Sequence, residues 1–195
     1  MKTLIGICLI ATMSWTSVQA QEKFEREYRI EDTAVPPAAR TLLTNWDLPV
    51  KSLKKLKWFA EESQDGKTFE AKFKFRGQRH SVEFSELGEL QDVEVHYRWK
   101  KLPKSLKSLL KKRLQQTFRS FKVKKVQFQY TGSVEAIKKA VFTGDLAEPL
   151  VLKYELVLTA EKDGDTAKYE VLLRRDGSLE KELKFAPVNS DNLEY

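Results

Sequence analysis

The chain contains an internal repeat, and this feature limits the possible folds more than any other in the sequence. The stretch VPPAARTLLTNW, from Val35, matches LPKSLKSLLKKR, from Leu102, in its apolar-Pro opening and in its later pair of leucines. SLKKLKWF then matches KVKKVQFQ, and HSVEFSELGEL aligns without a gap with YEVLLRRDGSL, so that Gly88 falls on Gly177. The common order of these blocks predicts a tandem duplication, with one unit at residues 21–100 and a second at 101–195.

Each unit has the pattern of a helix followed by four antiparallel strands. A proline near the start of each helix suits the first turn, where its missing N–H has no partner to lose. In FEAKFKF, residues 69–75, apolar and polar side chains alternate strictly, which is typical of a strand with one buried face. A sheet with one apolar face needs a helix to cover that face. The sequence therefore predicts an α+β fold made of tandem helix-plus-four-stranded units, each a two-layer sandwich.

The second unit carries an insertion at about residues 131–149, which has no counterpart in the first. Ser133 is placed to cap a short helix whose apolar positions are Val134, Ile137, Ala140 and Val141. Two interpretations stay open: a packing element, which is favoured, and a segment with a special function.

The first twenty residues, MKTLIGICLIATMSWTSVQA, have the order of a secretory signal peptide: a cationic start, a short apolar run and a small-residue cleavage pattern. We expect residues 1–20 to be removed and the protein to be periplasmic or extracellular. The only cysteine, Cys8, lies in this segment, so no disulfide or thiol chemistry is expected afterwards. No second long apolar segment follows, so no transmembrane segment is expected in the mature chain.

With this repeat and this export signal, the chain resembles PepSY-like domains. It is similar in particular to the beta-lactamase-inhibitor-like PepSY-like proteins exported by Bacteroidetes, and its FEREYRI opening and NLEY ending fit that group. The resemblance implies a non-enzymatic envelope protein in which two paired units form a concave polar surface. The beta-lactamase inhibitory protein grips an enzyme with such a surface, but it has disulfides. None of its contact residues is carried over here, and inhibition of a beta-lactamase is not predicted.

If helices cover one face of the sheet, the other face is open, and parity along the strands assigns its residues. This predicted open face carries Lys55, Lys57, Phe59, Glu70, Lys72, Lys74, Ser81, Glu83, Asp92, Glu94, His96, Arg98, Lys125, Gln127, Gln129, Lys153, Glu155, Val157, Thr159, Lys168, Glu170, Leu172, Arg174, Glu180, Glu182 and Lys184. Phe59, Val157 and Leu172 are apolar groups among charges, which makes them either binding anchors or residues covered by another part of the chain.

The second helix is the other candidate surface. It lies in a run, from Val95 to Val134, without any Asp or Glu. We expect its apolar residues, Leu106, Leu109, Leu110, Leu114 and Phe118, to pack into the core. Its lysines would then face solvent, where they favour an anionic partner. The candidate binding residues are therefore Lys57, Phe59, His96, Arg98, Val157 and Leu172 on the open face, and Lys104, Lys107, Lys111 and Lys112 on the second helix.

No catalytic, metal or cofactor motif is found. A GxSxG elbow, a P-loop and a dinucleotide fingerprint are all absent from the sequence. His80 and His96 fall on opposite faces by parity, so a shared metal site is not expected. The leading hypothesis is an exported, non-enzymatic binding protein that uses its open sheet face on an envelope protein or peptide. The alternative is binding to anionic lipid or acidic polysaccharide through the second helix. A nucleic-acid partner is not expected, and an enzyme with an unfamiliar site is the third hypothesis.

Overall fold

The structure is a computed structural model of the 195-residue chain. It describes residues 21–23, 25–46, 48, 52, 54–63, 66–146 and 149–186. The predicted signal peptide, residues 1–20, lies outside the described residues.

The described part of the chain alternates helices with runs of strands. Two short strands precede the first helix. The elements are β1 (Gln21–Lys23), β2 (Glu25–Ile30), η1 (Asp32–Ala34), α1 (Pro37–Thr44), β3 (Lys57–Ser63), β4 (Gly66–Phe75), β5 (Gln78–Phe84), β6 (Leu90–Tyr97), η2 (Trp99–Lys101), α3 (Lys104–Thr117), β7 (Ser120–Gly132), α4 (Val134–Thr143), β8 (Leu150–Lys162), β9 (Asp165–Arg174) and β10 (Leu179–Phe185).

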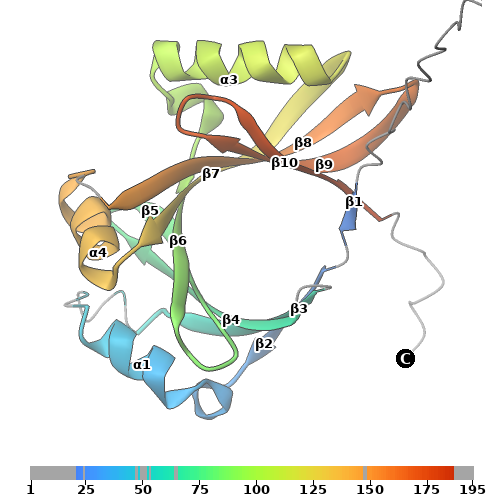
Figure 1. Ribbon diagram of the computed structural model, residues 1–195. Helices are drawn as coiled ribbons and strands as arrows, with labels where there is room; N and C mark the ends of the chain where they lie inside the picture. Colours follow the sequence, from blue (N-terminus) through green and yellow to red (C-terminus); the bar gives the residue numbers. More distant parts are fainter. Residues whose placement is uncertain are drawn as a thin grey trace, which may run out of the picture.

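All the described strands belong to one sheet, in the order β1-β10-β9-β8-β7-β6-β5-β4-β3-β2. The predicted α+β class is confirmed, but separate four-stranded sheets are not, because β6 pairs antiparallel with β7 and joins the two halves. The sequence prediction also omitted β1 and β2. These consecutive strands form the two edges of the sheet, β1 parallel to β10 and β2 antiparallel to β3. The sheet therefore curls round so that its edges approach each other (Figure 1).

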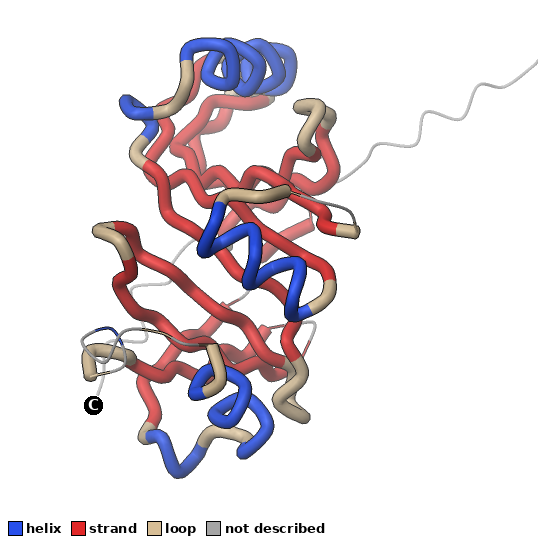
Figure 2. Tube along the Cα trace, turned by 90° about the vertical axis from the view of Figure 1, so that its left-hand side faces the viewer, coloured by secondary structure: helices blue, strands red, loops and turns tan. Residues whose placement is uncertain are grey.

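Helices α1, α3 and α4 lie along the outside of this curve, and the inside is left open (Figures 1 and 2). The outer face of the sheet is apolar as predicted: in β4, Phe69, Ala71 and Phe73 are all buried. The buried residues of α3 are Leu110 and Leu114. Leu109, which was expected in the core, is 38% exposed.

Leu109 lies against a hairpin turn at the protein surface, so part of its side chain stays exposed. A Cβ added at Gly177 would lie 2.8 Å from Leu109 Cγ, and Arg113 Nε donates to Gly177 O at 3.0 Å. In the first half, a Cβ added at Gly88 would lie 2.9 Å from Pro36 Cβ, at the start of α1. In each half a glycine with positive φ thus lets a turn approach the helix closely.

The predicted helix in the insertion is confirmed as α4. Ser133 is its N-cap and accepts a hydrogen bond from the Ala136 N–H at 3.2 Å. Phe142 of α4 lies against Phe75 and Trp46, with ring centroids 4.9 and 6.3 Å apart. Since Phe75 and Trp46 belong to the first half, the inserted helix packs one half of the chain against the other.

Candidate functional site

The face of the sheet that is turned away from the helices is called the concave face below. Cross-strand register aligns its residues in rows, such as Phe59, Glu70, Glu83 and Asp92. A second row runs through His96, Gln127, Glu155 and Leu172. The structure therefore brings the predicted residues Phe59, His96 and Leu172 to one face.

The last strand departs from the predicted parity. Leu179 pairs with Leu173, but Lys181 pairs with Leu172, so an irregularity at Glu180 shifts the register. A shift of one residue exchanges the two faces of a strand. Glu182 and Lys184 therefore lie on the helix side, and they pair there with Lys162 and Asp165 at 2.6 Å each. This corrects their predicted place on the open face.

The middle of the concave face is acidic. Glu70, Glu83, Asp92, Glu94 and Glu155 come from four strands, and we call this set the acidic floor. Asp92 is only 8% exposed, and its Oδ2 accepts a hydrogen bond from Gln129 Nε2 at 3.0 Å. Its other oxygen, Oδ1, and Oε1 of the 4% exposed Gln127 have no hydrogen-bond partner. Gln127 Nε2 donates to Glu94.

Burial in this setting disfavours ionised carboxyl groups. Burial raises the pKa of Asp92 well above its usual range, and the charges of Glu83 and Glu155 raise it further. Burial likewise raises the pKa of Glu94, with Glu155 and Asp92 adding to the effect. Asp92 and Glu94 therefore retain their protons to higher pH than ordinary carboxyl groups do.

One end of the concave face is basic. A groove of about 890 Å³ is lined there by Lys54, Lys55, Lys57, Phe59, Lys72, Phe73, Lys74, Arg79, His80, Ser81, Glu94, His96, Lys124, Lys125 and Gln127; we call it the basic groove. A second groove, of about 550 Å³, continues from Lys74, Arg79 and His96 to Arg98 and Lys101. Glu94 is the single carboxylate among these lining residues.

Few of these cations are neutralised. Lys72 pairs with Glu70 at 2.8 Å, and Lys125 lies 3.8 Å from Glu155. A further set has no ion pair with a carboxylate in the described part of the chain: Lys54, Lys55, Lys57, Lys74, Arg79 and Lys124.

The pKa of His96 is affected by the positive charges at this end of the sheet. Burial lowers its pKa, and the charges of Arg79, Lys125 and Arg98 lower it further. His80 lies on the opposite face, stacked on Phe73 with ring centroids 5.5 Å apart, and burial lowers its pKa to about 4.

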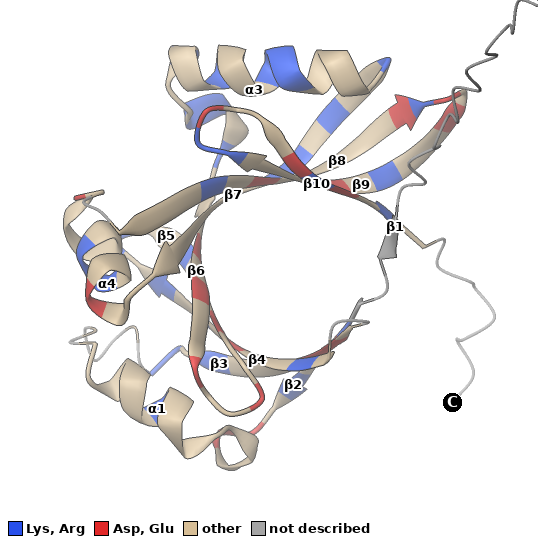
Figure 3. Cartoon of the chain, viewed as in Figure 1, with Lys and Arg blue, Asp and Glu red and all other residues tan. Residues whose placement is uncertain are grey.

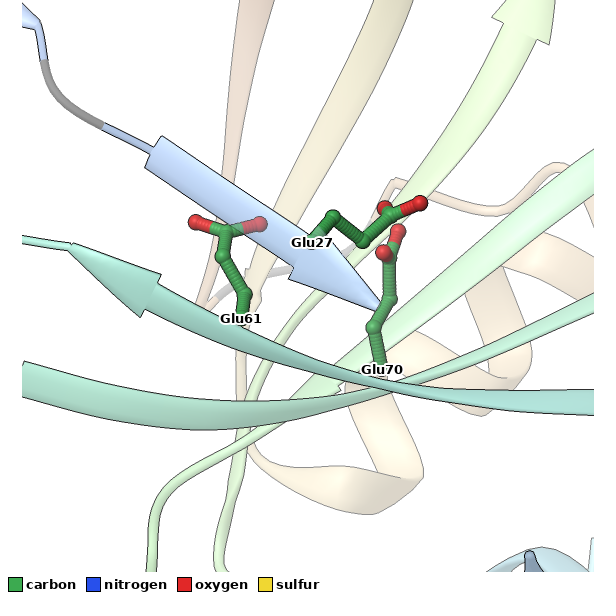
Figure 4. A group of neighbouring side chains, drawn as sticks. All are labelled: Glu27, Glu61 and Glu70. Carbon is green, nitrogen blue, oxygen red and sulfur yellow. The ribbon is translucent and has the colours of Figure 1, made fainter. Parts of the chain in front are cut away.

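The carboxylates of Glu27, Glu61 and Glu70 lie close enough together to suggest a cation site (Figure 4). However, Lys72 forms ion pairs with both Glu27 and Glu70. Its ammonium group supplies the positive charge that a metal ion would bring, so the geometry favours an ion-pair network.

The apolar residues of the concave face differ in accessibility. Val157 is 8% exposed and Leu183, which the shifted register brings to this face, is 3% exposed. Phe59 and Leu172 are partly exposed, and Lys72 Nζ lies 4.8 Å from the centre of the Phe59 ring. Phe59 and Leu172 are therefore the apolar groups of the original prediction that a ligand can reach.

The lysines of α3 form a separate surface, on the outside of the curve (Figures 1 and 3). Lys104, Lys111 and Lys112 are exposed, whereas Lys107 is partly buried and its Nζ donates to Lys100 O at 3.3 Å. The helix carries no acidic residue. The structure thus separates the ten predicted site residues into two groups on opposite sides of the sheet.

Sequence reasoning missed five lining residues of the basic groove: Lys54, Phe73, Arg79, His80 and Lys124. Arg79 shares the parity of Ser81, but the predicted strand began one residue too late to include it. Lys124 has the wrong parity and lines the groove because β7 is irregular between Val123 and Lys125. Starting the predicted strand one residue earlier would have placed Arg79 on the open face. Strict alternation puts Lys124 on the other face, and nothing in the sequence marks the irregularity that moves it.

Among the residues that the structure describes, no helix is long and apolar enough to cross a membrane.

No family model matches the chain, and the comparison with curated proteins gives no match. Solved structures to which the chain shows similarity include three from Bacteroides species. A proposed periplasmic protein from Bacteroides eggerthii has a TM-score of 0.48 at 14% identity, and the match covers 77% of this chain and 88% of that protein's chain. A DUF2874 family protein from Bacteroides ovatus has a TM-score of 0.47 with the same identity and coverage. A BLIP-like protein from Bacteroides fragilis has a TM-score of 0.46 at 18% identity, with 84% of this chain covering 96% of that one.

Proposed function

We propose that the protein is an exported, non-enzymatic interaction protein of the cell envelope, periplasmic or surface-associated, whose concave face binds a partner protein. The observation that carries this proposal is the basic groove on the concave face, with its many uncompensated cations. Such a face suits a convex protein surface, because hydrogen-bonding and charged groups surround a few accessible apolar ones. The predicted division into PepSY-like units at residues 21–100 and 101–195 stays part of this proposal.

A catalytic role would have to use the acidic floor, since buried carboxyl groups with raised pKa values are common in active sites. Here, however, those groups are engaged with one another and with amides. The charge of Glu155 raises the pKa of Glu94, and Gln127 donates to Glu94. Ser81 donates to Glu70, whose other oxygen pairs with Lys72. These contacts favour a structural role for the floor.

Site-specific photocrosslinking in living cells tests the proposal. The crosslinking residue is placed at Lys57 or Lys74, both exposed on the rim of the basic groove, and at Lys112 of α3 as the matched control. We expect one protein adduct, identified by mass spectrometry, from both groove positions and not from Lys112. Adducts of equal yield at all positions, or none at the groove, would refute a concave binding face.

A second candidate function is binding to an anionic surface through α3. The exposed Lys104, Lys111 and Lys112 on a helix without acidic residues favour it. Near an anionic bilayer each lysine contributes about 1 kcal/mol. Sedimentation with phosphatidylserine vesicles at low and high salt tests this function. A K104E/K111E/K112E variant that sediments like the parent chain would refute it.

A further inference from the structure

The basic groove is a site for anions by its charge alone. Lys74 and Arg79 lie directly opposite each other on β4 and β5, a like-charge arrangement that destabilises a sheet. Neither has an ion pair with a described carboxylate. The groove therefore holds cations at its rim that no described carboxylate neutralises.

We infer that the basic groove binds an acidic polypeptide segment of the partner protein, with Glu or Asp side chains against the rim lysines and Arg79. This inference rests on the proposed concave binding face and names the chemistry of its partner. Carboxylates of such a segment supply the missing counter-charge and accept charge-assisted hydrogen bonds from the rim cations.

Other polyanions fit the groove less well. A bilayer is flat and cannot enter the concave side of a curled sheet, whereas the outer helix α3 can meet it. Nucleic-acid bases bind by stacking on aromatic rings. The partly exposed rings of the groove are Phe59, which already has the Lys72 ammonium over it, and the imidazole of His96. A polypeptide needs no stacking platform.

The two histidines of the chain provide an internal readout. His96 faces the groove, with Arg79 on β5, Lys125 and Gln127 on β7, Glu94 on its own strand and Arg98 just beyond it. An acidic segment bound there adds negative charge next to His96 and should raise its pKa. His80 also contributes to the groove lining, but its side chain is buried and stacked on Phe73, so it should respond less than His96.

The test uses the full chain and a fluorescent oligoglutamate peptide, with oligolysine, a phosphatidylserine vesicle and a sulfated polysaccharide as comparison probes. Anisotropy should show saturable oligoglutamate binding that weakens with salt, and K74E/R79E should weaken it at least about tenfold. The matched charge change on the other side, K104E/K111E, should alter it by less than about twofold. In the complex, the NMR titration should shift more for His96 than for the buried His80.

Some results would overturn the inference. These are tighter binding of the polysaccharide or the vesicle than of oligoglutamate, an equal loss in both variants, or an unchanged His96 titration. If oligoglutamate does not bind while Lys57 and Lys74 still crosslink to one protein, the acidic-segment inference is wrong and the concave binding face stands. If both experiments fail, the concave binding face is wrong as well.

Discussion

Replacing Asp92 by Asn should stabilise the protein, although most substitutions of buried residues destabilise. Asp92 is 92% buried, its Oδ1 has no hydrogen-bond partner, and the charges of Glu83, Glu155 and Glu70 raise its pKa. An asparagine at this position keeps an oxygen for the Gln129 amide. It also places a new N–H donor among these carboxylates, where the unpartnered oxygen now lies.

The pH dependence of this gain follows from the direction of the pKa shift. Because the pKa of Asp92 is higher in the folded chain than in the unfolded one, the folded state binds more protons between the two values. The contribution of Asp92 to the free energy of unfolding therefore falls as pH rises through that range, and the loss is complete above the folded pKa. Asparagine does not titrate, so the D92N variant should gain most above that pKa and least near pH 4.

The expected size is that of leaving one buried polar group unsatisfied, about 1–3 kcal/mol in the free energy of unfolding. For a chain of 150–250 residues, each kcal/mol corresponds to a rise in Tm of about 2–4 °C. Urea unfolding of the parent, D92N and the exposed control E86Q, measured across a pH series, tests this. E86Q should stay within about 0.5 kcal/mol of the parent. A D92N variant that is less stable at pH 8, or whose gain is the same at every pH, would refute the reasoning.

Further predictions concern single positions. K74E places an acid opposite Arg79 and should raise the free energy of unfolding by about 0.2–1 kcal/mol while weakening oligoglutamate binding; no change in stability would contradict the like-charge argument. G164A, at φ 82° with no atom within 4 Å of the added Cβ, should lose about 1–2 kcal/mol in urea unfolding. In G177A, at φ 81°, the added Cβ would also lie 2.8 Å from Leu109 of α3, so this variant should lose more stability than G164A. Equal losses in the two variants would contradict a destabilising contact with Leu109. Burial lowers the pKa of His80 to about 4, so the unfolded chain takes up a proton at higher pH than the folded chain does. The free energy of unfolding should therefore fall as pH falls from about 6.5 towards 4. An H80F variant should not show this loss, and an identical acid profile would contradict it.

Alternation predicted which side chains share a face because a strand has a strict two-residue period. That rule placed Phe59, His96 and Leu172 together without any structure. It failed at Glu182, because nothing in the sequence marks the irregularity near Glu180 that exchanges the two faces of β10. A local rule holds only as long as the hydrogen-bond ladder stays regular.

The joining of the two halves lay beyond such local rules. The repeat predicted a helix and four strands in each half, but strand-to-strand pairing across the repeat is a long-range contact. The pairing of β6 with β7 makes one sheet of the two halves, and Phe142 of the inserted helix packs on Phe75 and Trp46 beside this junction. Neither contact has a counterpart in the first unit, so comparing the two repeats could not reveal them.

The curvature of the single sheet also explains how Asp92 and Gln127 are buried on a face that no helix covers. Side chains on the inside of a curled sheet crowd together, so those in the middle lose contact with water to their own neighbours. At the end of the sheet the neighbours are Lys74, Arg79 and Lys57, which remain exposed. Repulsion among these cations is not relieved by an ion pair within the described chain, whereas the raised pKa values of Asp92 and Glu94 favour their neutral forms. Lysine and arginine keep their charge near neutral pH, so this end of the concave face favours a ligand with negative charge.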